Sequence, residues 1–239
     1  MSDSFAVYIT LMTYVLHYAP DNASLIVRLA LDELGASYHA KLVDRSVSAQ
    51  KSQTYLALNP AGRIPVLETP SGPIFETAAI LLWLADQHSG LAPRMTDPKR
   101  TIFMSWLFYV SNTLHADLVS LFYPDRFVDA SALDDYNTRT RARLDHAFRL
   151  LDHHAAEWSA ADHGVTILDL YMAVIVRWCQ LYPVSGQAWF DLNAYPALLR
   201  VAKTVETRPS AQRAIVAEGL NTTPFSAADY AAPPEGSAV

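Results

Sequence analysis

The hydrophobic pattern of this 239-residue chain changes near residue 91. Before that point, short β-rich runs are interspersed with helical periodicity, whereas after it apolar residues recur almost only at helical spacing. Alternating strands and helices build an α/β layer, and a succession of helices builds a bundle. The sequence therefore predicts an α/β domain over residues 12–91 and an all-helical domain over residues 98–221.

Composition narrows the class of protein. Hydrophobic residues make up 51% of the chain and charged residues 18%, the balance of a globular protein with its own core. The net charge of −6 lacks the basic footprint that binds nucleic acid, so we expect no nucleic-acid partner. No apolar run reaches the roughly 18 residues of a membrane span. No charged n-region precedes the first apolar segment, and we expect a cytoplasmic protein without a membrane partner.

The α/β domain opens with a strand, a helix and a second strand. Residues 14–18 are β-rich, residues 24–35 have helical spacing that ends at a glycine, and residues 38–43 alternate. This succession predicts a parallel pair with a right-handed crossover. A hairpin around residues 69–73 and a helix over residues 78–88 complete a βαβ-ββα order.

The second half is predicted to be helical throughout. The Ala-, Pro-, Gly- and Ser-rich stretch 226–239 is expected to be a flexible tail. Helices are expected at residues 102–119, 133–158, 167–181 and 197–207.

The pair Ile64-Pro65 directly precedes a predicted strand, where proline removes a hydrogen-bond donor from the sheet. A cis bond would leave the main chain of Ile64 free to pair with an extended peptide ligand. An ordinary trans proline at the start of a strand is the alternative.

Glu76 and Thr77 stand at the predicted start of a helix, where main-chain N–H groups lack partners. They serve either as plain caps or as a site in which Thr77 holds a ligand carboxylate and Glu76 an ammonium. Ser24 and Tyr18 offer hydroxyls near the end of the first strand, where an N-cap and a packing residue are the ordinary interpretations.

Other reactive side chains are interpreted without a function. Cys179 is the single cysteine, forms no intrachain disulfide and is expected to be a buried, inert thiol in a reducing compartment. His153, His154 and Glu157 fit a solvated helix face, because a fourth ligand is missing, and no metal is expected.

Several segments, in this order along the chain, resemble the cytosolic glutathione transferases. They are a strand and loop leading to Ser24, the run Asn-Pro-Ala-Gly-Arg-Ile-Pro-Val-Leu at residues 59–67, and Phe-Glu-Thr-Ala-Ala-Ile at residues 75–80. Thr166 and Asp169 have the spacing of that family's buried capping box.

The resemblance covers about residues 14–220 and is closest to the bacterial beta class, which Trp106, His115 and the pair Arg177-Trp178 resemble. Two positions depart from that class. Ala23 stands where beta-class enzymes carry a cysteine, so mixed-disulfide chemistry is not expected, and Phe108 stands where they often carry asparagine.

The resemblance implies a thioredoxin-like first domain that binds the tripeptide glutathione as co-substrate. Ser24 is the expected hydrogen-bond donor to the glutathione sulfur, with Tyr18 and His115 as second candidates. The implied glutathione contacts are Ile64, Pro65, Glu76, Thr77, Arg63 and Lys51.

The predicted activity is attack of the glutathione thiolate on a hydrophobic electrophile. Glutathione-dependent isomerisation, dehalogenation or peroxide reduction, and a non-catalytic ligand-binding protein, are the alternatives on the same fold. A homodimer is expected from the resemblance and from the frequency of two-fold oligomers. The expected pocket for the electrophile is lined by Phe108, Tyr109, Phe122 and Tyr123.

Overall fold

A four-stranded mixed sheet forms the centre of the first domain in the computed structural model, which describes residues 13–160, 164–183 and 188–238. The strands lie in the order β2-β1-β3-β4. As predicted, β1 pairs in parallel with β2, and the pairs β1–β3 and β3–β4 are antiparallel. The strand bounds are Tyr14–Tyr18 (β1), Tyr38–Leu42 (β2), Val66–Thr69 (β3) and Gly72–Phe75 (β4).

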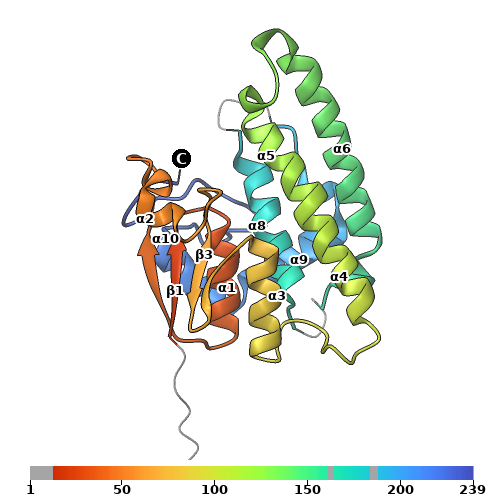
Figure 1. The fold of residues 1–239 in the computed structure, drawn as a ribbon. Helices are drawn as coiled ribbons and strands as arrows, with labels where there is room; N and C mark the ends of the chain where they lie inside the picture. Colours follow the sequence, from red (N-terminus) through yellow and green to blue (C-terminus); the bar gives the residue numbers. More distant parts are fainter. Residues whose placement is uncertain (1–12, 161–163, 184–187, 239) are drawn as a thin grey trace, which may run out of the picture.

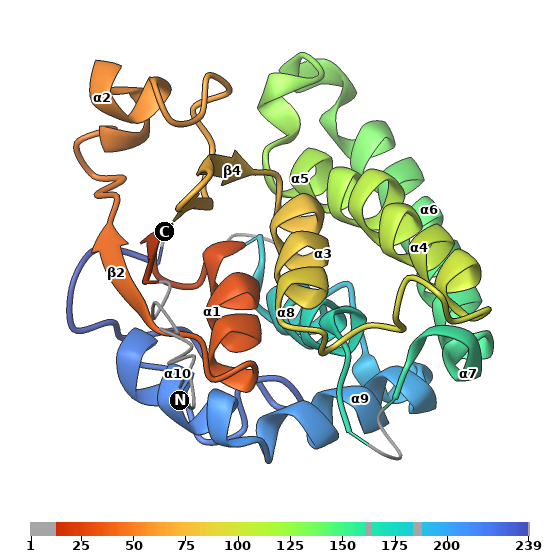
Figure 2. The ribbon, with the colours of Figure 1, turned by 60° about the horizontal axis from the view of Figure 1, so that its bottom comes forward.

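Helices α1 (Ser24–Glu33) and α3 (Thr77–Gln87) lie side by side on one face of this sheet (Figure 2). The alternation of β1 explains this, because Tyr14 and Leu16 point to the same face and are fully buried. Helix α1 ends just before Gly35, which adopts the left-handed conformation (φ 62°) expected of a C-terminal glycine. The short α2 (Gln53–Leu56) lies toward the opposite side.

The second domain is a helical bundle beside the sheet (Figure 1). The single helix predicted over residues 102–119 contains a π-helical turn, Val110–His115, between α4 and α5. Helix α10 was not predicted. The bounds are Arg100–Tyr109 (α4), Ala116–Phe122 (α5), Leu133–His153 (α6), Ala155–Trp158 (α7), Ile167–Leu181 (α8), Pro196–Glu206 (α9) and Pro209–Glu218 (α10).

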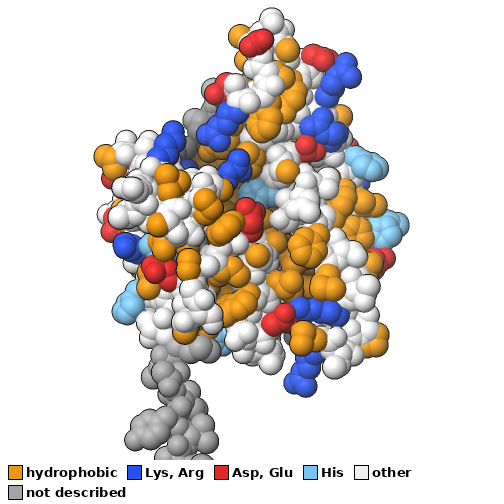
Figure 3. Space-filling view, in the orientation of Figure 1, with side chains coloured by type: hydrophobic (Ala, Val, Ile, Leu, Met, Phe, Trp, Pro, Cys, Tyr) orange, Lys and Arg blue, Asp and Glu red, His pale blue; other side chains and the backbone are white. Residues whose placement is uncertain are grey.

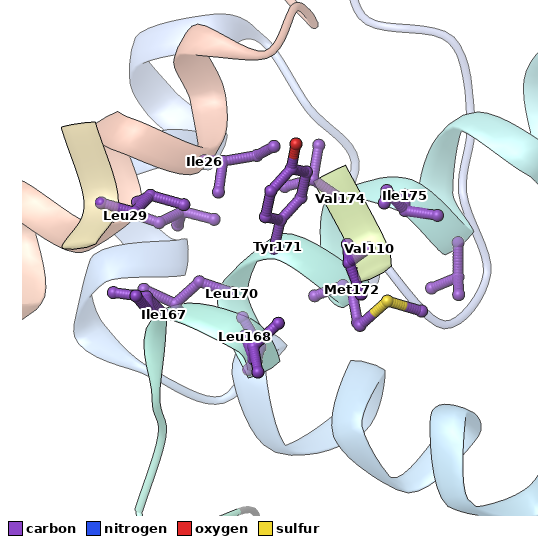
Figure 4. Packing of buried hydrophobic residues seen from close by; sticks show 14 of the residues in the cluster. Ile26, Leu29, Val110, Ile167, Leu168, Leu170, Tyr171, Met172, Val174 and Ile175 are labelled. Atoms are coloured by element: carbon purple, nitrogen blue, oxygen red, sulfur yellow. The ribbon is translucent and has the colours of Figure 1, made fainter. Parts of the chain in front are cut away.

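Helix α8 is the central element of the bundle, and every residue of it except Gln180 is buried. The predicted capping box at its start is confirmed: Thr166 Oγ1 accepts from Asp169 N at 3.2 Å, and Thr166 N donates to Asp169 Oδ2 at 2.7 Å. Figure 4 shows Ile26 and Leu29 of α1 facing α8. The two domains therefore share one hydrophobic core.

The chain beyond α10 crosses from the helical domain to the sheet (Figure 1), and its last described residues lie beside the end of β2, where Arg45 Nη2 donates to Ser237 O at 3.4 Å. Ala232 N donates to Gly219 O at 2.8 Å, and the Tyr230 hydroxyl donates to Leu181 O at 2.8 Å. A Cβ at Gly219 would lie 2.0 Å from Ala232 O, so only glycine allows this crossing. The stretch 226–239 was expected to be flexible. In the structure, which describes it as far as residue 238, it forms the hydrogen bonds of Tyr230 and Ala232 given above.

None of the helices in the described ranges combines the length and apolar character needed to cross a membrane.

Candidate functional site

The peptide bond between Ile64 and Pro65 is cis, which confirms one of the two alternatives considered from the sequence. Two side chains fix the turn before this bond: the Tyr55 hydroxyl and Asn59 Nδ2 both donate to Arg63 O, at 2.8 and 2.7 Å. Among the described residues, no main-chain group forms a hydrogen bond with the main chain of Ile64. An extended peptide therefore has a main-chain donor and acceptor available at this position.

Glu76 connects β4 to α3 with a left-handed backbone (φ 69°), a conformation that is uncommon for residues other than glycine. Its side chain is exposed and makes no capping hydrogen bond to the helix that follows. Thr77 begins the helix and is buried. Such backbone strain costs roughly 1 to 3 kcal/mol and is concentrated at functional sites, so it favours a binding role for Glu76 over that of a plain cap.

The two hydroxyls selected from the β1–α1 region are both occupied within the protein. Ser24 is fully buried; its Oγ donates to Ala19 O at 3.0 Å and accepts from Ala19 N at 3.2 Å. Tyr18 donates its hydroxyl hydrogen to Glu235, in the C-terminal tail. Either residue would have to release its present acceptor before donating to a ligand.

His115 closes the π-helical turn at the junction of the domains and is half-buried. Its Nδ1 lies 2.7 Å from the Tyr171 hydroxyl, and its ring packs against Trp178 with centroids 5.5 Å apart. Burial, together with the positive charge of Arg63, lowers the pKa of His115 to about 4. The imidazole is therefore neutral at neutral pH, and among the described residues Nε2 has no hydrogen-bond partner.

Tyr171 was not predicted from the sequence. Nothing in α8 distinguishes it from the other buried residues, and only the folded chain places its hydroxyl beside His115. Burial raises the pKa of Tyr171, and the negative charge of Glu76 raises it further, while a hydrogen bond from Ser111 lowers it. Figure 4 shows the Tyr171 ring within the shared core and its hydroxyl oxygen at the edge of the cluster.

These electrostatic effects show which predicted residues come together. The charge of Arg63 acts on His115 and that of Glu76 acts on Tyr171, so these two first-domain residues lie within electrostatic range of the His115–Tyr171 pair. Lys51 lies in an exposed 3₁₀ turn ahead of α2. In Figure 3, Lys and Arg side chains gather at the upper end of the junction between the domains.

The four aromatic residues expected to line the electrophile pocket fall into separate groups. The Phe122 ring packs against the Tyr182 ring with centroids 5.9 Å apart, and the Tyr182 ring packs against the Tyr230 ring with centroids 6.0 Å apart. We call these three residues the aromatic wall. Tyr109 instead packs against Trp106, Tyr123 lies under Arg126, and Phe108 is 47% exposed.

The other reactive side chains do not form a second site. Cys179 is buried, and burial raises the pKa of its thiol well above the usual value. His154 Nδ1 lies 2.8 Å from Glu157 Oε1, and Trp106 Nε1 donates to Glu157 Oε2. Within the described part of the chain, no group of three or more His, Cys, Asp and Glu side chains could hold a metal ion.

The sequence and the fold were compared with known proteins. Residues 12–86 match the family model "Glutathione S-transferase, N-terminal domain". Glutathione S-transferase GST-4.5 of Xanthomonas campestris pv. campestris is 29% identical over 211 residues, covering 86% of this chain and 99% of the relative.

Two solved structures extend the similarity over both domains. A sphingomonad glutathione S-transferase complexed with glutathione is 31% identical, with a TM-score of 0.70, over 87% of this chain and all of the other. A bacterial beta-class glutathione S-transferase from Sphingomonas chungbukensis is 28% identical, with a TM-score of 0.69, over 86% and 98% of the two chains. From these matches, and from the cis proline and left-handed Glu76 described above, the chain belongs to the glutathione S-transferase family.

Proposed function

We propose that this protein is a glutathione transferase that binds glutathione at the junction of its domains and activates the thiol for attack on a hydrophobic electrophile. The observation that carries the proposal is the neutral imidazole of His115, whose Nδ1 lies 2.7 Å from the Tyr171 hydroxyl, within electrostatic range of Arg63 and Glu76. A structure 31% identical to this chain was solved in complex with glutathione.

Glutathione is an extended peptide with a charged group at each end. In this proposal the cysteinyl unit pairs with the main chain of Ile64, next to the cis Pro65. The carboxylate of Glu76 binds the ammonium of the γ-glutamyl unit, and Thr77, at the start of the 11-residue helix α3, binds its carboxylate. Arg63 and Lys51 are the candidate partners of the glycine carboxylate.

Activation requires a lower pKa of the glutathione thiol, because the thiolate is the nucleophile. Lowering that pKa from about 8.5 to about 6.5 takes about 2.7 kcal/mol. One hydrogen bond to the charged sulfur contributes about 1.5 to 3 kcal/mol, and a helix N-terminus about 0.3 to 1 kcal/mol. A single well-placed donor is therefore sufficient.

We propose His115 as that donor in preference to Ser24 and Tyr18. In this proposal the Tyr171 hydroxyl, 2.7 Å away, donates to His115 Nδ1. This arrangement keeps the imidazole proton on Nε2, where it can donate to sulfur. The Ser24 and Tyr18 hydroxyl hydrogens are already donated to Ala19 O and Glu235.

The reaction follows from this arrangement. The thiol proton leaves to solvent, the sulfur forms a bond to the electrophilic carbon, and a leaving group, where there is one, departs with the electron pair of its broken bond. The aromatic wall is the proposed apolar surface for the electrophile, because binding pockets are lined mainly by apolar and aromatic side chains. Its rings come from α5, the end of α8 and the tail.

We also propose a homodimer. Helix α4 exposes Ile102 and Phe108 at 40% and 47%, large apolar side chains that a partner surface would cover. Figure 3 shows hydrophobic side chains gathered over the region of α3 and α4. Light scattering on the purified protein tests this, and a monomer mass at micromolar concentration would contradict it.

The deciding experiment for the function is the ultraviolet difference spectrum of the purified protein mixed with glutathione near pH 6.5. Free glutathione is only about 1% ionised there, given a thiol pKa of about 8.5, so a thiolate band reports both binding and activation. Calorimetry on the same samples measures binding alone. Binding without the band would contradict activation, and no binding would contradict the whole proposal.

A further inference from the structure

The carboxylate of Asp21, in the loop between β1 and α1, is fully buried and receives four hydrogen bonds from the helical domain. Arg177 donates from Nε at 2.9 Å and from Nη2 at 3.0 Å. Trp178 Nε1 donates at 3.1 Å, and the Tyr182 hydroxyl donates at 3.1 Å. All the donors stand at the end of α8, so one side chain of the first domain binds the end of this helix.

The backbone of the same residue is also fixed. Asp21 has φ 49°, in the left-handed region that residues other than glycine rarely adopt. Its N–H donates to Glu218 Oε2 at 2.9 Å, and Glu218 Oε1 accepts from Arg28 Nε at 2.8 Å. The side chains of α1 and α10 thus hold the loop in a conformation that it would not adopt alone.

The remaining donors of Arg177 are also used. Nη1 donates to Pro224 O at 3.1 Å, and Nη2 also donates to Asp229 O at 3.0 Å. Removing two charges from water costs so much that buried ion pairs often add little net stability. The position of this pair, beside the proposed glutathione site, therefore calls for an explanation other than stability.

Two of the side chains that bind Asp21 also contact residues of the proposed site. The Trp178 ring packs against His115, the proposed thiol donor. The Tyr182 ring is the middle member of the aromatic wall, between Phe122 and Tyr230. Asp21 is thus one contact away from the thiol donor and from the surface proposed for the electrophile.

We propose that Asp21 is a positioning residue for the transferase reaction, and that Arg177 holds it in place. The carboxylate fixes the β1–α1 loop, Trp178 and Tyr182 in one arrangement, so that the thiol donor and the aromatic wall keep a constant position relative to each other. This inference rests on the proposed function, because a positioning residue has meaning only if glutathione is activated there.

The primary test is Asp21→Asn, which keeps the size of the side chain and removes its charge. Bound thiol pKa is read from a pH titration of the thiolate band, and kcat and KM from turnover of a simple electrophile. We expect the thiol pKa to rise by about one unit and kcat to fall about tenfold, since each pKa unit is a factor of ten in the ionisation equilibrium. The dissociation constant of glutathione should change less than threefold, because its contacts are untouched.

Asp86→Asn is the matched control. Asp86 Oδ2 pairs with Arg100 Nη2 at 2.8 Å, an ion pair that also joins the two domains but touches neither the loop nor His115. The same substitution there should leave the thiol pKa and kcat unchanged. If both variants lower kcat equally, the ion pairs have a general structural role and the proposal is wrong.

Tyr182→Phe keeps the test decisive if Asp21→Asn does not fold. This variant removes one of the four hydrogen bonds to Asp21 and retains the ring in the aromatic wall. We expect a smaller rise in the thiol pKa and a two- to fivefold loss of kcat, and a folded Tyr182→Phe protein with wild-type values would overturn the inference. Failure of the proposed function is distinct, because it would remove the thiolate band from the wild-type protein.

Discussion

His115 Nδ1 and the Tyr171 hydroxyl are 2.7 Å apart, and this hydrogen bond leaves Nε2 as the nitrogen available to the proposed glutathione site. A histidine that donates through Nε2 must accept at Nδ1 while it is neutral. We propose that Tyr171 supplies the hydrogen for that acceptor, which would set the donor orientation of His115 before any ligand binds.

His115→Phe keeps a ring against Trp178 but has no hydrogen-bond donor, and it should lower turnover at least tenfold and change the dissociation constant of glutathione less than threefold. The reason is that the variant loses the donor to the thiolate but none of the contacts proposed for the peptide. Ser24→Ala is the comparison, and a loss below tenfold is expected because the Ser24 hydrogen is donated to Ala19 O. Stopped-flow and steady-state kinetics measure both variants; a larger loss in Ser24→Ala would assign the donor to Ser24 instead.

The lowered pKa of His115 makes stability depend on pH. The folded pKa is about 4 against an ordinary value of 6.5, so between these values the unfolded chain binds a proton that the folded protein does not. The free energy of unfolding contributed by His115 is therefore complete above pH 6.5 and lost as the pH falls toward 4, on the order of 2 kcal/mol. Urea titrations should show a weaker decline between pH 6.5 and 4.5 in His115→Gln, and equal declines would contradict a buried neutral imidazole.

Glu76→Gln should weaken glutathione binding about 10- to 100-fold, since a hydrogen bond to a charged group contributes about 1.5 to 3 kcal/mol. Because Glu76 makes no capping bond to α3, the thermal midpoint should remain within a few degrees of wild type. Calorimetry measures the affinity. Asp135→Asn removes an exposed carboxylate on α6 and serves as the control. Equal affinities in the two variants would rule out Glu76 as the ammonium partner.

Tyr18→Phe should leave turnover within threefold of wild type, because its hydroxyl hydrogen is donated to Glu235. Loss of that hydrogen bond should lower the free energy of unfolding by about 1 kcal/mol. Glu235→Ala removes the acceptor of the same hydrogen bond and should show the same small destabilisation. Steady-state kinetics and thermal unfolding measure the two variants, and a tenfold loss of turnover in Tyr18→Phe alone would identify Tyr18 as the thiol donor.

Local patterns predicted the first domain well. The β-rich run of β1, the glycine after α1 and the cis proline before β3 all depend on neighbouring residues, which a sequence displays directly. The capping box was predicted for the same reason, since its two members are three residues apart. The π-helical turn was missed because no residue type or spacing in the sequence distinguishes it from an α-helix.

The site was predicted less completely because its geometry depends on distant residues. The sequence selected Glu76 and Ile64 as candidates, but it could not show that Ser24 would bond to Ala19 or that Tyr18 would bond to Glu235. Those partners are decided by how the chain packs, and in the second case by a tail that composition alone marked as flexible.

The buried ion pairs also bear on how the protein is made. Asp21 and Arg177 are 156 residues apart, and Arg28 and Glu218 are 190 residues apart. At a synthesis rate of about 5 to 20 residues per second, the first domain waits roughly 8 to 40 seconds for its counter-charges to be translated. An early hydrophobic core around α1 would bury Asp21 and Arg28 unpaired, so we expect the nascent domain to stay open there until Arg177 and Glu218 have been translated.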